Sequence, residues 1–393
     1  MSRRWDVVIV GAGIHGAGIA QAAAAAGHTA LVLEQNAIAA GSSSRSSKLI
    51  HGGLRYLESG QLRLVRESLH ERKLLLRLAP ELVHLQKFFI PVYRQTRRRP
   101  WQLRTGLSLY ALLAGLDASA HFGTLPRRQW AQLDGLATQD LQQVFWYHDG
   151  QTDDALLTAA VMRSAQSLGA ELALPAQCLG ATLGADAVRV RYRHEGAEQE
   201  CEAGVFVNAA GAWARALAQC IEPRPAVPAL ELVQGSHLVY EGPPQAGVYY
   251  VESPRDGRAI FVMPWHGKLL VGTTEVRFRG DPATVAPGAH EVHYLQEVLR
   301  HYFPRFRDAA LAQPVASFAG LRVLPAGVGH AFHRSRETLL TIDRPSRPRL
   351  LSVYGGKLTT WRAVAARALE MISASLPARP PRARTDQLEL RAS

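Results

Sequence analysis

The sequence has little that would cross-link a small fold or bind a structural metal. Its 393 residues include only three cysteines, Cys178, Cys201 and Cys220, and none belongs to a C-x-x-C pair. This pattern excludes a disulfide framework and a cysteine-ligated zinc site, so we expect no metal. Cysteines this few and this scattered are typical of a protein in the reducing cytoplasm.

A long hydrophobic run is also missing. The most apolar segment, GLSLYALLAGL at 106–116, is shorter than the roughly 18 apolar residues that indicate a membrane-spanning helix. The first residues, MSRRWDVVIV, lead directly into a predicted strand, so we expect no signal peptide. Together these absences predict a cytoplasmic protein.

Acidic residues are scarce relative to basic ones. The chain has 33 Asp and Glu against 45 Lys and Arg, a net charge of +12. The run RQTRRRPWQLR at 94–104 concentrates this charge. Together with the apolar residues after it, the run is compatible with a peripheral helix on an anionic membrane, and equally with a buried helix beside a solvated basic surface. No RNA motif or pattern of stacking aromatics accompanies the charge, so we expect no nucleic-acid partner.

A nucleotide-binding motif begins within the first residues. Residues 5–10 form an apolar run typical of a strand buried on both faces of a parallel sheet. Gly11, Gly13 and Gly16 complete G-x-G-x-x-G before an alanine-rich helix, and Glu34 ends the next predicted strand. The glycines permit a tight turn, close approach of a pyrophosphate and close helix packing, while the acid accepts hydrogen bonds from ribose hydroxyls. The segment predicts an adenine-dinucleotide site.

The rest of the chain favours FAD over NAD. In nicotinamide dehydrogenases, strand–helix units usually continue after the acid, but here the polar loop NAIAAGSSSRSSKLIHGGLRYLE follows at 36–58. Two later segments, GVFVNAAGAWA at 204–214 and LLSVYGGKLTTWR at 350–362, each end a predicted strand in small residues, where backbone can approach a ligand closely. Three separated strand ends suit a long, buried cofactor.

Several segments resemble those of the FAD-dependent glycerol-3-phosphate dehydrogenases, within the larger D-amino-acid-oxidase-like group of flavoproteins. In chain order they are VVIVGAGIHGAGIA, SSKLIHGGLRYLE, VNAAGAWA, QGSHLVY, VGTTEV, GLRVL and LLSVYGGKLTTWR. The resemblance implies FAD as cofactor and oxidation of sn-glycerol 3-phosphate to dihydroxyacetone phosphate by hydride transfer to flavin N5. Electrons would pass to a quinone or another acceptor. The alternative is a related dehydrogenase or oxidase that acts on another 2-hydroxy acid or on an amino acid.

The resemblance also implies which residues hold the cofactor. The serine-lysine part of the 36–58 loop would wrap the FAD. The residues after the last glycine pair would present a helix N-terminus to the flavin, where its positive end stabilises the reduced ring. We expect His15, inside the glycine motif, to point away from the phosphates. The predicted cofactor contacts are Gly11, Gly13, Gly16, Glu34, Ser42, Ser43, Ser47, Lys48, Cys178, Gly211, Gly356, Lys357, Leu358 and Thr359.

Four residues are candidates for the chemistry on the substrate: His51, Arg55, Arg322 and Lys357. His51 is the candidate base, because a neutral imidazole accepts a proton near pH 7; Lys357 or a water held by Arg322 are alternatives. Arg55, Arg322 and Lys357 match positively charged family positions suited to a substrate phosphate. Further substrate-binding candidates are Tyr56, Thr274 and Arg336.

The predicted fold is α/β, with an α+β substrate part. A Rossmann-like FAD-binding domain of residues 1–75, 148–226 and 337–375 is interleaved with an antiparallel-sheet substrate domain of 76–147 and 227–336. We expect the short alternating strands of this second domain at 227–336, and helices and surface loops at 76–147. Residues 376–393 are proline-rich and charged, which predicts a disordered tail. Relative to the family that the chain resembles, we expect it to lack a further C-terminal helical domain.

Overall fold

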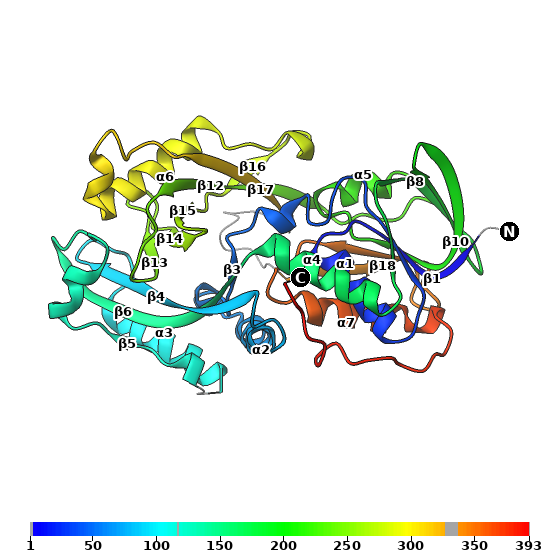
Figure 1. The fold of residues 1–393 in the computed structure, drawn as a ribbon, viewed down its shortest axis with the longest axis horizontal. Helices are drawn as coiled ribbons and strands as arrows, with labels where there is room; N and C mark the ends of the chain where they lie inside the picture. The colour runs from blue at the N-terminus through cyan, green and yellow to red at the C-terminus, as the bar shows by residue number, and fades with distance from the viewer. Residues whose placement is uncertain (1–2, 116–117, 327–336, 393) are drawn as a thin grey trace.

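The computed structural model describes residues 3–115, 118–326 and 337–392. The chain forms two halves in space, each built around a large sheet (Figure 1). The first half contains the first sheet described below, and the second half contains the second sheet. None of the helices in the described ranges combines the length and the apolar character needed to traverse a bilayer. The α/β fold class is confirmed.

The first sheet has a parallel centre, with β1 between β2 and β10 and with β19 beside β10. Antiparallel β8 and β9 extend it on one side, and its order is β11-β8-β9-β10-β1-β2-β7, with β18 and β19 off this path. Its strands are β1 (Arg4–Val10), β2 (Ala30–Leu33), β7 (Glu171–Ala173), β8 (Ala176–Leu183), β9 (Val188–His194), β10 (Ala197–Asn208), β11 (Ile221–Glu222), β18 (Leu339–Ile342) and β19 (Leu350–Tyr354).

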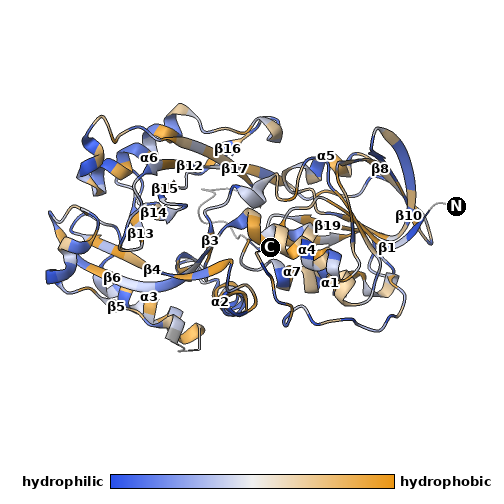
Figure 2. Cartoon of the chain, viewed as in Figure 1, coloured by the Kyte–Doolittle hydropathy of each residue, from blue (hydrophilic) through white to orange (hydrophobic). Residues whose placement is uncertain are grey.

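Three helices cover this sheet: α1 (Ile14–Ala25), α4 (Asp154–Ser167) and α7 (Trp361–Ile372). Apolar and polar residues alternate along the sheet and these helices (Figure 2), and the buried apolar side chains of both form one core cluster. The small residues of α1 let its neighbours approach closely, since a Cβ added at Gly18 would lie 2.6 Å from the Trp361 ring. The alanine-rich sequence therefore forms a helix buried almost all round between α4 and α7.

The second sheet is mostly antiparallel, with the order β16-β12-β15-β14-β13-β4-β6-β3; β17 pairs with β12, and β5 with β6. Its strands are β3 (Leu49–Ile50), β4 (Val83–Tyr93), β5 (Gly123–Thr124), β6 (Leu141–Thr152), β12 (Leu230–Glu241), β13 (Val248–Glu252), β14 (Ala259–Trp265), β15 (Lys268–Gly272), β16 (Val276–Phe278) and β17 (Ala316–Pro325). The remaining α-helices are α2 (Leu62–Leu78), α3 (Pro100–Leu113), α5 (Ala214–Ala218) and α6 (Ala289–Tyr302).

The prediction that residues 76–147 contribute only helices and loops is wrong. β4 and most of β6 lie in this range and pair along their length in the second sheet. β4 contains Pro91 and β6 carries the polar ends LQQ and HDGQT, so neither has the alternating pattern of a strand. Pairing between distant segments overrides this weak local preference.

The prediction of a disordered C-terminus is also wrong for residues 376–392. Leu390 is 3% exposed, and its N–H donates to the Leu78 carbonyl. The backbone N–H groups of Arg382 and Ala383 both donate to the carbonyl of Ala25, at the end of α1. The segment runs back past α7 without regular secondary structure (Figure 1). The composition correctly predicted that this segment forms no helix or strand. It did not predict that the segment is ordered by contacts with the first half.

Candidate functional site

A cavity of about 560 Å³ lies between the two halves. Its lining combines the turn after β1, the 40–56 loop, the segment 209–217, β17 and the turn at 355–359 before α7. Ligand pockets commonly have volumes of roughly 300–1,000 Å³. Segments that are far apart in the sequence therefore meet around one ligand-sized space.

The glycine motif forms a tight turn at one end of this cavity. Gly11 has a φ of +102°, and a Cβ there would lie 2.7 Å from the Ala209 carbonyl oxygen. A Cβ at Gly16 would overlap the backbone of Gly11. Gly11 and Gly13 line the cavity, whereas Gly16 is outside the lining and lets α1 pack against the turn.

Glu34 lies at the end of β2, where it lines the cavity. One carboxylate oxygen accepts a hydrogen bond from Ala12 N at 2.8 Å, and the other accepts one from Asn36 N at 2.9 Å. Each carboxylate oxygen has two acceptor sites, so this fixed side chain can still accept a ligand hydroxyl. The position suits the ribose contact predicted from the motif.

The serine loop is tied down by its own hydroxyls. Ser43 Oγ accepts a hydrogen bond from Ile14 N at 2.9 Å, which satisfies a backbone donor at the start of α1. Ser42 Oγ donates to the Leu321 carbonyl at 2.6 Å, and Ser47 Oγ lies 3.0 Å from His237 Nε2. Ser42, Ser43 and Ser47 all line the cavity. Their hydroxyls connect this loop to α1, β17 and β12.

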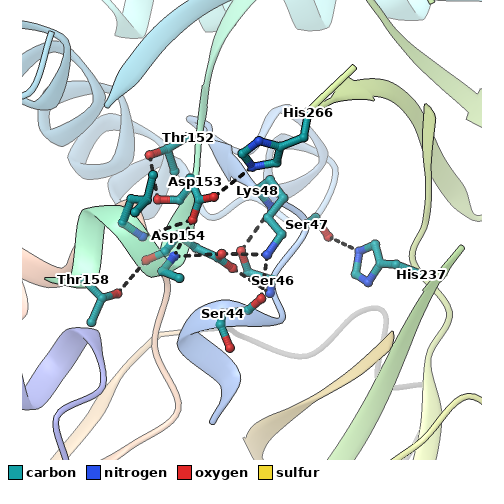
Figure 3. A network of polar contacts seen from close by, with 12 residues as sticks. Ser44, Ser46, Ser47, Lys48, Thr152, Asp153, Asp154, Thr158, His237 and His266 are labelled. Atoms are coloured by element: carbon teal, nitrogen blue, oxygen red, sulfur yellow. Dashed lines mark hydrogen bonds and ion pairs between the residues drawn. The ribbon is translucent and has the colours of Figure 1, made fainter. Parts of the chain in front are cut away.

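Lys48, in contrast, does not line the cavity. Its Nζ lies 2.6 Å from Asp154 Oδ1 and donates to the Ser44 carbonyl at 2.6 Å (Figure 3). The Lys48 side chain is 6% exposed and that of Asp154 is fully buried. Burial raises the pKa of Asp154, while the Lys48 charge opposes this rise. Lys48 therefore links the loop to the start of α4 rather than reaching the cavity.

The turn before α7 forms the other end of the cavity. Gly356 has a φ of +110°, and a Cβ there would overlap the His15 ring. Lys357, Leu358 and Thr359 follow it in the lining, and α7 begins at Trp361. This turn thus brings the predicted helix N-terminus to the cavity.

His15 also lines the cavity, with its ring beside the turn at Gly356. Burial lowers the pKa of His15 to about 4, and the nearby Arg367 charge adds to this effect. The imidazole is therefore neutral near pH 7. Its position inside a glycine motif gave no signal of the contact with the turn at Gly356.

The candidate base His51 lies at the same end. Its backbone N–H donates to Thr359 Oγ1 at 3.2 Å, which ties the histidine to the turn before α7. The next residue is held from the opposite side, since Gly52 N donates to Tyr110 OH at 2.9 Å and to Asp149 Oδ1 at 3.3 Å.

Asp149 is a site residue that sequence reasoning missed. It lines the cavity while almost fully buried, and burial raises its pKa. Arg72 Nη1 donates to its carboxylate at 2.7 Å, as does Tyr110 OH at 2.7 Å. No motif indicated this cluster, because its members come from α2, α3 and β6.

Two of the predicted cations lie against one aromatic ring. Lys357 Nζ lies 3.7 Å from the centroid of the Tyr56 ring, and the Arg55 guanidinium carbon lies 5.5 Å from it. Arg322 lines the same cavity, where its Nη2 donates to Thr273 Oγ1 at 3.1 Å. The structure therefore brings His51 and these three cations to one space. Arg336 lies outside the described residues.

Thr274 is not part of the lining; Thr273 and Glu275 are. The Glu275 carboxylate lies 3.5 Å from Arg322 and 3.3 Å from Arg258, which also lines the cavity. Arg258 and Glu275 are further residues that sequence reasoning missed. The only available signal for Glu275 was its place in VGTTEV.

The predicted cofactor contacts Cys178 and Gly211 also line the cavity. Burial raises the pKa of Cys178 to about 12, so its thiol is protonated near neutral pH. Within the described ranges, no group of three or more His, Cys, Asp or Glu side chains is placed to hold a metal ion.

The sequence pattern of the FAD dependent oxidoreductase (DAO) family matches residues 6–362. Glycerol-3-phosphate dehydrogenase of Pseudomonas aeruginosa is 34% identical, over 94% of this chain and 71% of the relative. D-erythritol 1-phosphate dehydrogenase of Brucella abortus is 33% identical, over 95% and 74%. Aerobic glycerol-3-phosphate dehydrogenase of Escherichia coli is also 33% identical, over 94% and 73%.

Solved structures are similar over the whole fold. Glycerol-3-phosphate dehydrogenase from Bacillus halodurans complexed with FAD superimposes with a TM-score of 0.75 at 24% identity, over 99% of this chain and 68% of that one. FAD-bound L-alpha-glycerophosphate oxidase from Mycoplasma pneumoniae gives a TM-score of 0.76 at 16% identity, over 99% of both chains. At these identities the likeness concerns the fold.

Proposed function

Because the chain belongs to the DAO family of FAD-dependent oxidoreductases, we propose that it oxidises sn-glycerol 3-phosphate to dihydroxyacetone phosphate. The observation that carries this proposal is the grouping of Arg55, Arg322 and Lys357 with His51 in the cavity that also contains the glycine motif. Relatives named for this activity, at 33–34% identity, support it.

The cavity fits the family's cofactor. Gly11 and Gly356 have positive φ values, and a Cβ at either position would meet backbone or a neighbouring ring, so the main chain itself forms these walls. We propose that Glu34 binds the adenosine ribose and that the 356–359 backbone faces the flavin. When bound, FAD supplies the hydride acceptor at flavin N5.

The cations would anchor the substrate phosphate. Guanidinium groups bind phosphate oxygens in bidentate geometry, and a lysine adds a point charge. Tyr56 lies against both Arg55 and Lys357, which limits the directions in which these long side chains can turn. Arg322 is oriented by Thr273 and Glu275. A charged anchor of this kind orients the carbinol carbon for reaction.

We propose that His51 accepts the proton of the substrate hydroxyl as the hydride leaves carbon. Its peptide is held by Thr359 on one side and, through Gly52, by Asp149 and Tyr110 on the other. Proton transfer requires a base held within hydrogen-bond reach of the reacting group. Lys357 and a water held by Arg322 remain the alternative bases.

The electrons would then pass to a quinone or another acceptor, at a peripheral membrane contact. Helix α3 supports such a contact: Trp101 is 68% exposed and Leu112 is 61% exposed, with Arg104 on the same solvent side. Its buried residues include Leu103 and Leu107, which belong to the core cluster beside β4 and β6 of the second sheet. Exposed apolar and basic residues on one amphipathic helix suit an anionic interface.

An anaerobic titration of the purified flavoenzyme tests the proposal. We expect sn-glycerol 3-phosphate, but not glycerol, to bleach the absorbance of the oxidised flavin. Equal bleaching by glycerol would contradict the phosphate anchor. Faster reduction by D-erythritol 1-phosphate would favour a second candidate activity, which the Brucella abortus relative suggests. A 2-hydroxy acid and an amino acid complete the panel, and mixing the reduced enzyme with a quinone or with oxygen compares the acceptors.

A further inference from the structure

We infer that Glu291, on α6, is a positioning residue for the anionic substrate and acts through Thr274 on Arg322. This inference rests on the proposed function, in which Arg322 binds the substrate phosphate. Glu291 is outside the cavity lining, and no sequence motif indicated it.

Glu291 is a buried carboxylate that collects several hydrogen bonds. It is 1% exposed. Its Oε2 accepts from Gly288 N at 3.0 Å, as expected for an acid in the first turn of a helix, and its Oε1 accepts from Ser236 Oγ at 2.8 Å. Thr274 Oγ1 and Gln234 Nε2 also donate to it. A charged group this buried needs such donors, so its position and theirs are fixed together.

Thr274 joins this buried cluster to the cavity. Its Oγ1 donates to Glu291 and accepts from Ser236 N at 2.8 Å, so the hydroxyl acts both as a donor and as an acceptor. Its carbonyl oxygen accepts from Arg322 Nη1 at 3.4 Å, and the preceding Thr273 Oγ1 accepts from Nη2 at 3.1 Å. The side chain of Thr274 thus faces α6, while its backbone faces the guanidinium.

Strand β12 lies between the Glu291 cluster and the cavity, and its alternating residues face one or the other. Gln234 and Ser236 direct their side chains to Glu291, whereas Gly235 between them lines the cavity. Successive residues of a strand face opposite sides. A Cβ at Gly235 would lie 2.5 Å from Thr273 Oγ1 and 2.7 Å from Arg322 Nη2, so the glycine leaves the space that the guanidinium occupies.

These contacts make the direction of Arg322 dependent on Glu291. The segment 273–275 carries three acceptors for the guanidinium: Thr273 Oγ1, the Thr274 carbonyl and the Glu275 carboxylate. Removing the bond between Thr274 and Glu291 would release this segment from α6. The guanidinium would then keep its charge but lose its fixed orientation toward the substrate.

The test compares Thr274→Val, which keeps the branched shape but removes the hydroxyl, with Thr274→Ser, which keeps the hydroxyl. Glu291→Gln is the companion variant. The readouts are bound FAD, kcat and KM for sn-glycerol 3-phosphate, and the affinity for inorganic phosphate, followed through the absorption of the oxidised flavin. We expect Thr274→Val and Glu291→Gln to raise KM and weaken phosphate binding about tenfold, with a smaller change in kcat. Thr274→Ser should restore most of the binding.

Thr96→Val is the matched control, because Thr96 is buried and its hydroxyl donates to the Tyr93 carbonyl at 2.8 Å, outside the cavity lining. It should lower the melting temperature without weakening phosphate binding. If Thr274→Val lowers only the melting temperature, as the control does, the inference is wrong. If the wild type binds phosphate but does not oxidise sn-glycerol 3-phosphate, the proposed function fails, and the phosphate affinities of the variants still decide the inference. A wild type that neither binds nor reacts would overturn both.

Discussion

His15 illustrates how burial, more than residue type, determines the state of a side chain in the cavity. In the folded protein its pKa is about 4, against an ordinary value of 6.5, because burial disfavours the charged ring. Between these two values the unfolded chain binds more protons than the folded chain. The free energy of unfolding therefore falls as the pH drops from 6.5 to 4.

We expect His15→Asn to remove this contribution. The loss of stability between pH 6.5 and 4 should be smaller in the variant than in the wild type, by on the order of 3 kcal/mol. Urea unfolding at a series of pH values measures it. His237, whose pKa burial also lowers, remains in both proteins and serves as an internal reference. Parallel pH profiles for the two proteins would contradict the assignment.

The cavity residues fall into those that the sequence could predict and those that it could not. Gly11 and Glu34 were predictable, because a tight turn and the end of a parallel strand impose local patterns. Lys48 and Thr274 share motifs with cavity residues, yet their partners Asp154 and Glu291 direct their side chains elsewhere. Those partners lie on other helices, and no local sequence pattern predicts how these helices pack against the motif.

At the scale of elements, the Lys48–Asp154 pair connects the serine loop to α4. Lys48 Nζ also lies 5.1 Å from the rings of both Trp265 and Phe318, which belong to the second sheet (Figure 3 shows the surrounding polar contacts). The pair therefore holds a segment of the first half, a loop that lines the cavity and two strands of the second half around one buried charge.

Replacing Lys48 should thus destabilise the protein strongly. Lys48→Met leaves Asp154 buried without its cation, which we expect to lower the free energy of unfolding by about 3–5 kcal/mol. The double variant Lys48→Met/Asp154→Asn removes the uncompensated charge and keeps an acceptor for Ser46 N. We expect denaturant unfolding to show that the double variant recovers a large part of the lost free energy of unfolding. A double variant no more stable than Lys48→Met would show that the charge is not the cause.

At the scale of the whole molecule, the two-part architecture was predictable because each half has its own sequence pattern. Apolar runs predicted the parallel strands of the first sheet, and short alternating runs predicted β12 to β15 in the second. β4 and β6 were not predictable, since their stability comes from pairing with each other over a long separation. The same holds for residues 376–392, which are ordered by the surface they contact and not by their own preferences.

This C-terminal segment connects elements that are distant along the chain. Arg379 pairs with Asp6 of β1 at 2.9 Å, and Arg382 donates to the Ala25 carbonyl at the end of α1. Leu390 then enters the core cluster of the first half and donates its N–H to Leu78, the last residue of α2. The segment therefore fastens β1, α1 and α2 together after the last helix.

Leu390→Ala tests this role directly. Truncating a buried leucine removes apolar burial and leaves a cavity, so we expect the free energy of unfolding to fall by about 2–5 kcal/mol and proteolysis within 376–392 to accelerate. Glu389→Ala is the matched control, because the Glu389 side chain is 71% exposed and should change neither quantity measurably. If the segment were free in solution, both substitutions would be silent, since a side chain already in water loses no burial when it is shortened.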